Sequence, residues 1–170
     1  MPNYAVIDLG SNTIRLVVYE VKDDRRKTYS SKDFKSLIND KVMAGLSAFV
    51  AADGTFTDDG VRRAASVLKG HAKRARYFDC KRIDVFATAV LRNAANSAEA
   101  VAAIERESGL TIDLLSAADE AHLGFAGATC DRTIERGTLV DIGGGSTELV
   151  LGSTSVKQAI SIDMGAVRVT

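Results

Sequence analysis

The residues best suited to chemistry occur in two segments of one pattern, the first near the start of the chain and the second near its end. They read Asp8-Leu9-Gly10-Ser11-Asn12-Thr13-Ile14-Arg15 and Asp141-Ile142-Gly143-Gly144-Gly145-Ser146-Thr147-Glu148. In each, an Asp ends an apolar stretch, and a turn with glycine and hydroxyl side chains follows. Glycine lets a backbone approach a ligand closely, and backbone N–H and hydroxyl groups can donate to phosphate oxygens.

Two such turns facing each other would hold one phosphate group from both sides, which is the site that the repeat predicts. A carboxylate repels a phosphate, so Asp8 and Asp141 are expected to act through a bound Mg²⁺, which prefers oxygen ligands. An ordinary hairpin with a capping Asp explains either copy alone but not the repeat. The chain lacks the Gly-Lys-Ser/Thr of a P-loop, and strands rather than helices are expected after both turns, which excludes a dinucleotide fingerprint. The phosphate-binding residues expected in the turns are Gly10, Ser11, Asn12, Thr13, Gly143, Gly144, Gly145, Ser146 and Thr147.

Apolar stretches around both turns predict two hairpins, with strands over 4–7 and 14–19 in the first and over 138–140 and 147–151 in the second. Between the hairpins, strand and helix patterns alternate, which is typical of an α/β layer fold. Residues 34–44 show no clean period and give no assignment. The other expected elements are a helix after Thr57, a strand over 83–87, a loop over 88–96, a helix capped by Ser97 and ended by Gly109, and a strand over 111–115.

The helix expected after Thr57 has a basic face. A solvated surface is the ordinary interpretation of such a face, and a surface that guides a long polyphosphate is the alternative. His71 lies on the same helix and is expected to have a packing or surface role. The basic residues are Arg62, Arg63, Lys69, Lys73, Arg74 and Arg76.

The segment after the strand over 111–115 carries a candidate general base. Ser116 and Asp119 have the spacing of a capping box, so Glu120 is expected in the first turn of a helix. The positive end of a helix favours an ionised carboxylate and attracts phosphate, and such a carboxylate can accept a proton from an attacking water. Satisfying the helix dipole alone is the alternative role for Glu120. His122 lies about 200° further around the helix and should point away.

Length and composition limit these interpretations. The chain has 170 residues, with 22 basic and 22 acidic side chains and a net charge of zero, so no overall field attracts a polyanion. Any affinity for anions must therefore be local, and DNA is not an expected partner. No apolar run approaches the roughly 20 residues of a membrane span, and the start does not read as a signal peptide. We therefore expect a cytoplasmic protein without a membrane partner.

Several segments in order resemble the exopolyphosphatase and guanosine pentaphosphate phosphatase family (Ppx/GppA). Besides the two turns, the resemblance rests on 87–92 (Ala-Thr-Ala-Val-Leu-Arg), 116–121 and 164–168 (Met-Gly-Ala-Val-Arg). It implies an α/β, ribonuclease H-like or actin-like ATPase fold, with a mixed sheet flanked by helices. On this basis we expect a complete first domain over 1–123, carrying the first phosphate loop and the base, and a partial second domain over 124–170 with the second loop. The full-length form is expected to be a homodimer.

The resemblance also implies roles for individual residues. Glu120 would activate water against the terminal phosphorus, with Asp141 as a second catalytic residue. Asp8, Asp141 and Glu148 would hold or position Mg²⁺, while Arg92 and both turns would bind phosphoryl oxygens. The implied substrates are inorganic polyphosphate and guanosine pentaphosphate, which these residues do not distinguish.

Two departures from the family pattern keep other functions open. The family usually has Gly at the position of Ala117, and commonly an Arg at that of Met43. A catalytically weak phosphate- or nucleotide-sensing module is one alternative. An ATP-dependent kinase or ATPase of the same superfamily is the other, because it would share both turns.

Overall fold

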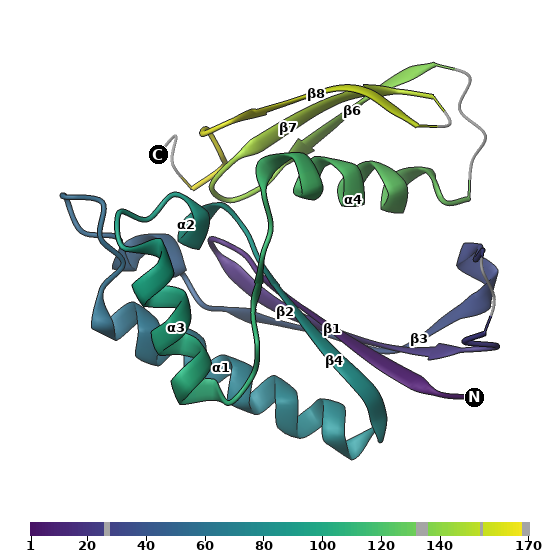
Figure 1. Ribbon diagram of the computed structural model, residues 1–170, viewed down its shortest axis with the longest axis horizontal. Coiled ribbons are helices and arrows are strands. Elements are labelled where there is room, and N and C mark those ends of the chain that lie inside the picture. The colour runs from purple at the N-terminus through teal and green to yellow at the C-terminus, as the bar shows by residue number, and fades with distance from the viewer. Residues whose placement is uncertain (26–27, 132–135, 154, 168–170) are drawn as a thin grey trace.

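The computed structural model describes residues 1–25, 28–131, 136–153 and 155–167. Arg168, the last residue of the final family motif, lies outside them. Two β-sheets lie one above the other, with helices below the first sheet and one helix between the two (Figure 1). No helix in the described ranges combines the length and apolar character that a membrane span requires.

The first sheet has the strand order β3-β2-β1-β4-β5 and is mixed. Strand β1 pairs antiparallel with β2 and parallel with β4; β2–β3 is antiparallel and β4–β5 parallel. This mixed sheet confirms the expected fold class. The strands are β1 (Asn3–Leu9), β2 (Thr13–Val21), β3 (Phe34–Met43), β4 (Cys80–Ala87) and β5 (Asp113–Leu114).

Helices α1 (Asp58–Tyr77) and α3 (Ser97–Ser108) cover the lower face of this sheet in Figure 1. Alternate residues of β1 and β2 are fully buried against them, which is the period of two that a one-sided strand requires. Helix α1 begins where predicted, because the Thr57 hydroxyl accepts a hydrogen bond from the Gly60 N–H at 3.3 Å. The 3-10 helices η1 (Ser31–Asp33) and η2 (Leu46–Phe49) follow β2 and β3.

A second, smaller unit consists of α4 (Ala117–Thr129) and the antiparallel sheet β6 (Gly137–Ile142), β7 (Thr147–Gly152) and β8 (Val156–Ile162). Ala121 and Phe125 of α4 pack on Val150 of β7, forming a small core of their own. Helix α4 is continuous across residues 123 and 124, so the expected domain division there stays a prediction.

Three local expectations were wrong. Residues 88–96 are not only loop: α2 (Ala89–Arg92) forms because Leu91 and Arg92 both donate to the Thr88 carbonyl. Asn96, not Ser97, precedes α3; its side-chain amide bonds both backbone groups of Phe56 and does not cap the helix. The strand over 111–115 shrinks to two residues, because the Ile112 N–H donates to the Glu105 carboxylate of α3 instead of a strand.

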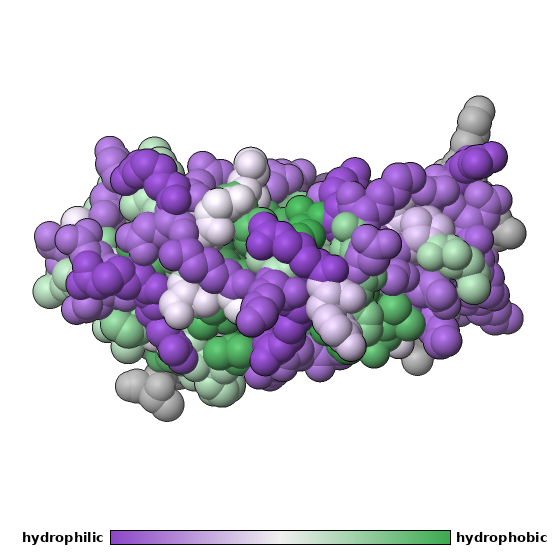
Figure 2. Space-filling view, turned by 90° about the horizontal axis from the view of Figure 1, so that it is seen from below, coloured by the Kyte–Doolittle hydropathy of each residue, from purple (hydrophilic) through white to green (hydrophobic). Residues whose placement is uncertain are grey.

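The basic face of α1 is exposed, and the surface over α1 and α3 is largely hydrophilic (Figure 2). His71 instead points inward and is fully buried. One ring nitrogen, Nε2, lies 3.2 Å from the Ile14 carbonyl at the start of β2. Of the packing and surface roles expected for His71, the structure therefore shows the packing role.

Candidate functional site

A cavity of about 200 Å³ lies where the two predicted turns meet. Most of the residues predicted for the site line it, together with Thr88 and Ala89. The predicted residues in its wall are Asp8, Gly10, Ser11, Asn12, Thr13, Glu120, Asp141, Gly143, Gly144, Gly145, Ser146 and Glu148. The fold thus brings together segments from both ends of the chain and the start of α4.

The two turns have the same backbone geometry. The Gly10 N–H donates to the Thr13 carbonyl at 3.0 Å, and the Gly143 N–H donates to the Ser146 carbonyl at 2.9 Å. The flanking strands share one register, with Asp8 opposite Arg15 and Asp141 opposite Glu148. The sequence repeat is therefore a structural repeat.

The two turns touch each other, and glycine makes this possible. A Cβ atom on Gly145 would lie 2.4 Å from the Ser11 Oγ and 3.2 Å from its Cβ. A Cβ on Gly144 would lie 3.3 Å from the Ser11 Cβ. Real Cβ atoms essentially never approach another atom within 3.0 Å, so glycine at position 145 lets the two turns touch without displacing the Ser11 hydroxyl.

Segments outside the hairpins hold both turns in place. The Ala44 and Gly45 N–H groups donate to the Asn12 carbonyl at 2.9 and 2.8 Å. On the other turn, Ala166 donates to the Gly143 carbonyl at 2.9 Å and Val167 to that of Gly144 at 3.0 Å. These bonds fix the turn conformations before any ligand arrives.

Glu120 occupies the first turn of α4, as predicted. The Ser116 hydroxyl caps this helix, accepting from the Asp119 N–H at 3.1 Å and donating to the Asp119 carboxylate at 2.6 Å. Burial raises the pKa of the Glu120 carboxyl; a hydrogen bond from Arg92 opposes this shift, and the charge of Glu148 adds to it. The Glu120 carboxyl, which lines the cavity, therefore binds a proton more readily than a free glutamate side chain.

Arg92 lies behind Glu120 and does not line the cavity. Its Nη1 donates to the Glu120 Oε2 at 2.6 Å and to the Leu115 carbonyl at 3.2 Å. The two charged side chains are 16% and 22% exposed, so water screens the pair only in part. Sequence reasoning named both residues but not their pairing, because 28 positions separate them and no local period links the two.

The carboxylates of Asp8, from the first hairpin, and Asp141, from the second, both line the cavity. Asp8 is exposed to solvent, yet the protein atoms packed around its carboxyl raise the pKa of that group through desolvation. The charge of Arg15 lowers this pKa and that of Asp141 raises it. A Cβ on Gly124 of α4 would lie 3.4 Å from the Asp141 Oδ2, so this small residue leaves room for the carboxylate. Glu148 is buried and accepts a hydrogen bond from the Ser161 hydroxyl at 2.9 Å.

These carboxylates fit Mg²⁺ only in part. Within the described ranges, no three His, Cys, Asp or Glu side chains converge as a ready-made metal centre. Mg²⁺ commonly uses one or two carboxylates, with waters and substrate phosphates completing its shell. Asp8 and Asp141, close enough for one to raise the pKa of the other, match that smaller requirement.

Thr147 is placed differently from the other turn residues. Its hydroxyl donates to the Met164 carbonyl at 2.5 Å, and the residue does not line the cavity. His122 is exposed, with Nδ1 2.7 Å from the Ala118 carbonyl, and also lies outside the cavity wall. The phosphate-binding role of Thr147 stays a prediction.

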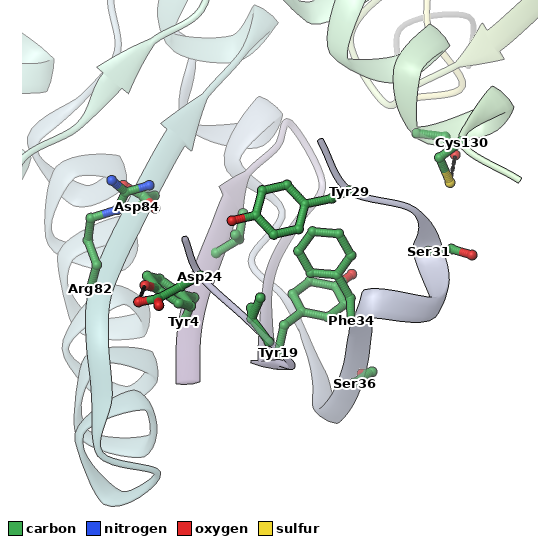
Figure 3. A pocket seen from close by; sticks show the side chains of 13 residues that line it. Tyr4, Tyr19, Asp24, Tyr29, Ser31, Phe34, Ser36, Arg82, Asp84 and Cys130 are labelled. Carbon is green, nitrogen blue, oxygen red and sulfur yellow. Dashed lines mark hydrogen bonds and ion pairs between the residues drawn. The ribbon is translucent and has the colours of Figure 1, made fainter. Parts of the chain in front are cut away.

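A larger pocket of about 750 Å³ lies between the upper face of the first sheet and the end of α4. Figure 3 shows the rings of Tyr19, Tyr29 and Phe34 gathered on one side, with Arg82 and Asp84 on the other. It contains neither glycine turn, and Arg82 is already bonded to Asp84 at 2.9 Å. The glycine and hydroxyl residues predicted to bind phosphate therefore line the smaller cavity and not the larger pocket.

Comparison with known proteins agrees with this geometry. The Ppx/GppA phosphatase family model matches residues 17–170. A guanosine-5'-triphosphate,3'-diphosphate pyrophosphatase of Vibrio cholerae is 33% identical over 168 residues, covering 98% of this chain and 32% of the relative. Exopolyphosphatase 2 of Mycobacterium tuberculosis is 29% identical over 175 residues, covering 98% of this chain and 53% of the relative.

Solved structures show the same relationship. The crystal structure of an exopolyphosphatase from Cytophaga hutchinsonii superposes with a TM-score of 0.86 at 25% identity, covering 98% of this chain and 52% of that one. The crystal structure of the Aquifex aeolicus Ppx/GppA family member superposes with a TM-score of 0.76 at 28% identity, covering 99% of this chain and 53% of that one. This chain therefore spans about a third to a half of the length of these relatives.

Proposed function

Because this chain belongs to the Ppx/GppA phosphatase family of hydrolases, we propose that it takes part in transferring the terminal phosphoryl group of inorganic polyphosphate, guanosine pentaphosphate or both to water. The observation that carries this proposal is the cavity in which both glycine turns meet Glu120. A site built to hold one phosphoryl group beside a carboxylate suits hydrolysis.

In the proposed reaction the two turns hold the terminal phosphoryl group through backbone N–H groups and the hydroxyls of Ser11, Thr13 and Ser146. Glu120 orients a water molecule and accepts its proton while the water oxygen bonds to phosphorus and the bridging P–O bond breaks. The shortened phosphate chain leaves with the bridging oxygen. Positioning and charge stabilisation supply most of the acceleration in such reactions.

Arg92 is proposed to orient the base. Its 2.6 Å hydrogen bond fixes the Glu120 carboxylate, and its charge favours the ionised form that accepts a proton. The phosphate-binding role expected for Arg92 requires the guanidinium to reach past Glu120, and both roles are compatible with its five N–H donors.

Asp8 and Asp141 would hold Mg²⁺, with Glu148 beside them. The ion, when bound, would neutralise negative charge on the phosphoryl oxygens. Without that charge, carboxylates on the cavity wall would repel the substrate. Affinity for phosphate is therefore expected to depend on Mg²⁺.

The experiment measures orthophosphate release, with Mg²⁺ present, from long-chain polyphosphate, guanosine pentaphosphate and ATP by wild-type and Glu120→Gln protein. Loss of a general base is expected to lower turnover about 10²–10⁴-fold. Binding of orthophosphate, followed by calorimetry, should survive the substitution. Equal turnover in both proteins would remove Glu120 from the mechanism, and binding without turnover in the wild type would favour a sensing role.

A further inference from the structure

The outer face of the second sheet, which is the side turned away from α4, is apolar and uncovered. Val150 of β7 packs on α4, and successive side chains of a strand point to opposite faces, so Leu149 and Leu151 point outward. Figure 1 shows α4 below this sheet and no helix of the described residues above it. The nine residues that form the outer face are Thr138, Val140, Ile142, Thr147, Leu149, Leu151, Gln158, Ile160 and Ile162.

The first hairpin shows that a face of this kind belongs in a core. In the shared register of the two hairpins, Val140 and Ile142 stand where the first hairpin has Ile7 and Leu9. Ile7 and Leu9 are fully buried beneath the helices of the first sheet, whereas Val140 and Ile142 are 54% and 66% exposed. In the described part of the chain no helix is left to cover them, because α1, α2 and α3 pack on the first sheet and α4 on the inner face of the second. A cover for the outer face therefore comes from outside the described residues.

The charge of the outer face favours a second copy of the chain as that cover. None of its nine residues is charged, and the whole chain carries 22 basic and 22 acidic side chains. Like charges on two identical faces would keep the copies apart, and neither the outer face nor the chain has an excess of charge. Each copy also brings the apolar surface that the other lacks.

The shape and the area of the outer face also suit pairing with itself. A hollow of about 250 Å³ has Ile142 and Ile162 in its wall, and the row formed by Val140, Leu149 and Ile160 stands next to it. In a two-fold arrangement the row of each copy meets the hollow of the other. The half-exposed side chains offer roughly 500 Å² per copy, and about 1,000 Å² in total is close to the smallest area of a specific interface.

We propose that the outer face of the second sheet is the interface of a two-fold dimer of this chain, in which the two sheets pack face to face. Packed sheets of this kind lie about 10 Å apart, with their side chains interdigitating. Asp141 and Glu148 line the phosphate cavity and belong to the inner side of the sheet. The dimer therefore leaves the cavity open and does not depend on the proposed function.

The test is sedimentation velocity of this chain from about 1 µM to about 200 µM, because an interface of this size gives a micromolar dissociation constant. Ile160→Lys places a charge in the middle of the outer face. Leu123→Lys is the matched control, because Leu123 lies on α4, outside that face, and both side chains are 52% exposed. Circular dichroism of each variant shows whether it is folded.

The wild type is expected to change from monomer to dimer as its concentration rises. Ile160→Lys should weaken the dimer by about 10-fold or more, because each copy would bury an unpaired ammonium group. Leu123→Lys should change the dissociation constant by less than about 2-fold, as substitutions on a free surface do.

A second measurement keeps the test decisive if the lysine at position 160 prevents folding. Ile160→Cys and Leu123→Cys are treated with iodoacetamide at low and high protein concentration, and mass spectrometry of the peptides gives the rate at each site. Position 160 should react more slowly at high concentration, and position 123 should react at one rate.

Three results would overturn the inference. A wild type that stays monomeric at every concentration would leave the outer face to a helix of another chain. A dimer that Ile160→Lys leaves intact, or that Leu123→Lys weakens equally, would lie on a different surface. Assemblies that keep growing beyond two copies would indicate pairing of exposed strand edges in place of a closed interface.

Discussion

Replacing Gly145 by alanine tests whether the contact between the two turns builds the phosphate site. The new Cβ would lie 2.4 Å from the Ser11 Oγ and 3.2 Å from its Cβ. The hydroxyl can rotate away, but it then no longer points at the cavity, and the remaining contact is still tighter than most Cβ contacts. A hydrogen bond to a charged group contributes about 1.5–3 kcal/mol. We therefore expect a roughly 10- to 100-fold loss of phosphate affinity, at about 1.4 kcal/mol for each tenfold change.

The assay is orthophosphate binding by calorimetry in a double-mutant cycle. Ser11→Gly removes the two nearest atoms that the new Cβ of Gly145→Ala would meet, and the next nearest is the Ala89 Cβ at 3.4 Å, an ordinary contact distance. In that background the second substitution should cost less than about 3-fold, because its cost is coupled to Ser11. Gly127→Ala is the control: nothing lies within 4 Å of its Cβ. If Gly145→Ala binds phosphate normally, or loses as much without the Ser11 side chain, the turns do not depend on this contact.

Three further results are expected. The rate of phosphate release should fall as the pH drops through the raised pKa of Glu120. Arg92→Leu should move that fall to higher pH, because the substitution removes the hydrogen bond that lowers the pKa of Glu120. A pH–rate profile that is the same in the variant and the wild type contradicts this. Burial lowers the pKa of His71 in the folded protein, so the unfolded chain binds the proton more tightly, and stability should drop as the pH falls below about 6.5. His71→Gln should abolish this part of the pH dependence in urea unfolding. Ser116→Ala should destabilise the protein by about 1 kcal/mol through loss of the α4 cap, measured by urea unfolding, while Ser66→Ala on the exposed side of α1 should have little effect.

The sequence predicts the parts of the fold whose signals are local. Both hairpins, the start of α1 at Thr57 and the start of α4 at Ser116 depend on apolar alternation and on capping residues within a few positions of each other. The wrong predictions occur where a hydrogen bond to a residue distant in the sequence replaces the bond that the local pattern predicts. Asn96 bonds the backbone of Phe56, and the Glu105 carboxylate holds the backbone of Ile112.

The candidate site follows the same rule. The repeat of Asp, glycine and hydroxyl residues identifies the turns and predicts that they face one another. It does not predict that Ser11 touches Gly145, that Arg92 holds Glu120 or that the Thr147 hydroxyl bonds the Met164 carbonyl. Each of these depends on how the two sheets are placed relative to each other, which no local pattern determines.

The shared geometry of the two turns provides an internal control for mutagenesis. A Cβ on Gly10 would meet the Thr13 carbonyl at 3.1 Å, and one on Gly143 would meet the Ser146 carbonyl at 3.2 Å. The same substitution at either position therefore imposes nearly equal local strain. Any difference between the two variants reports how unequally the two turns share the ligand, which a single substitution in an unrepeated site cannot show.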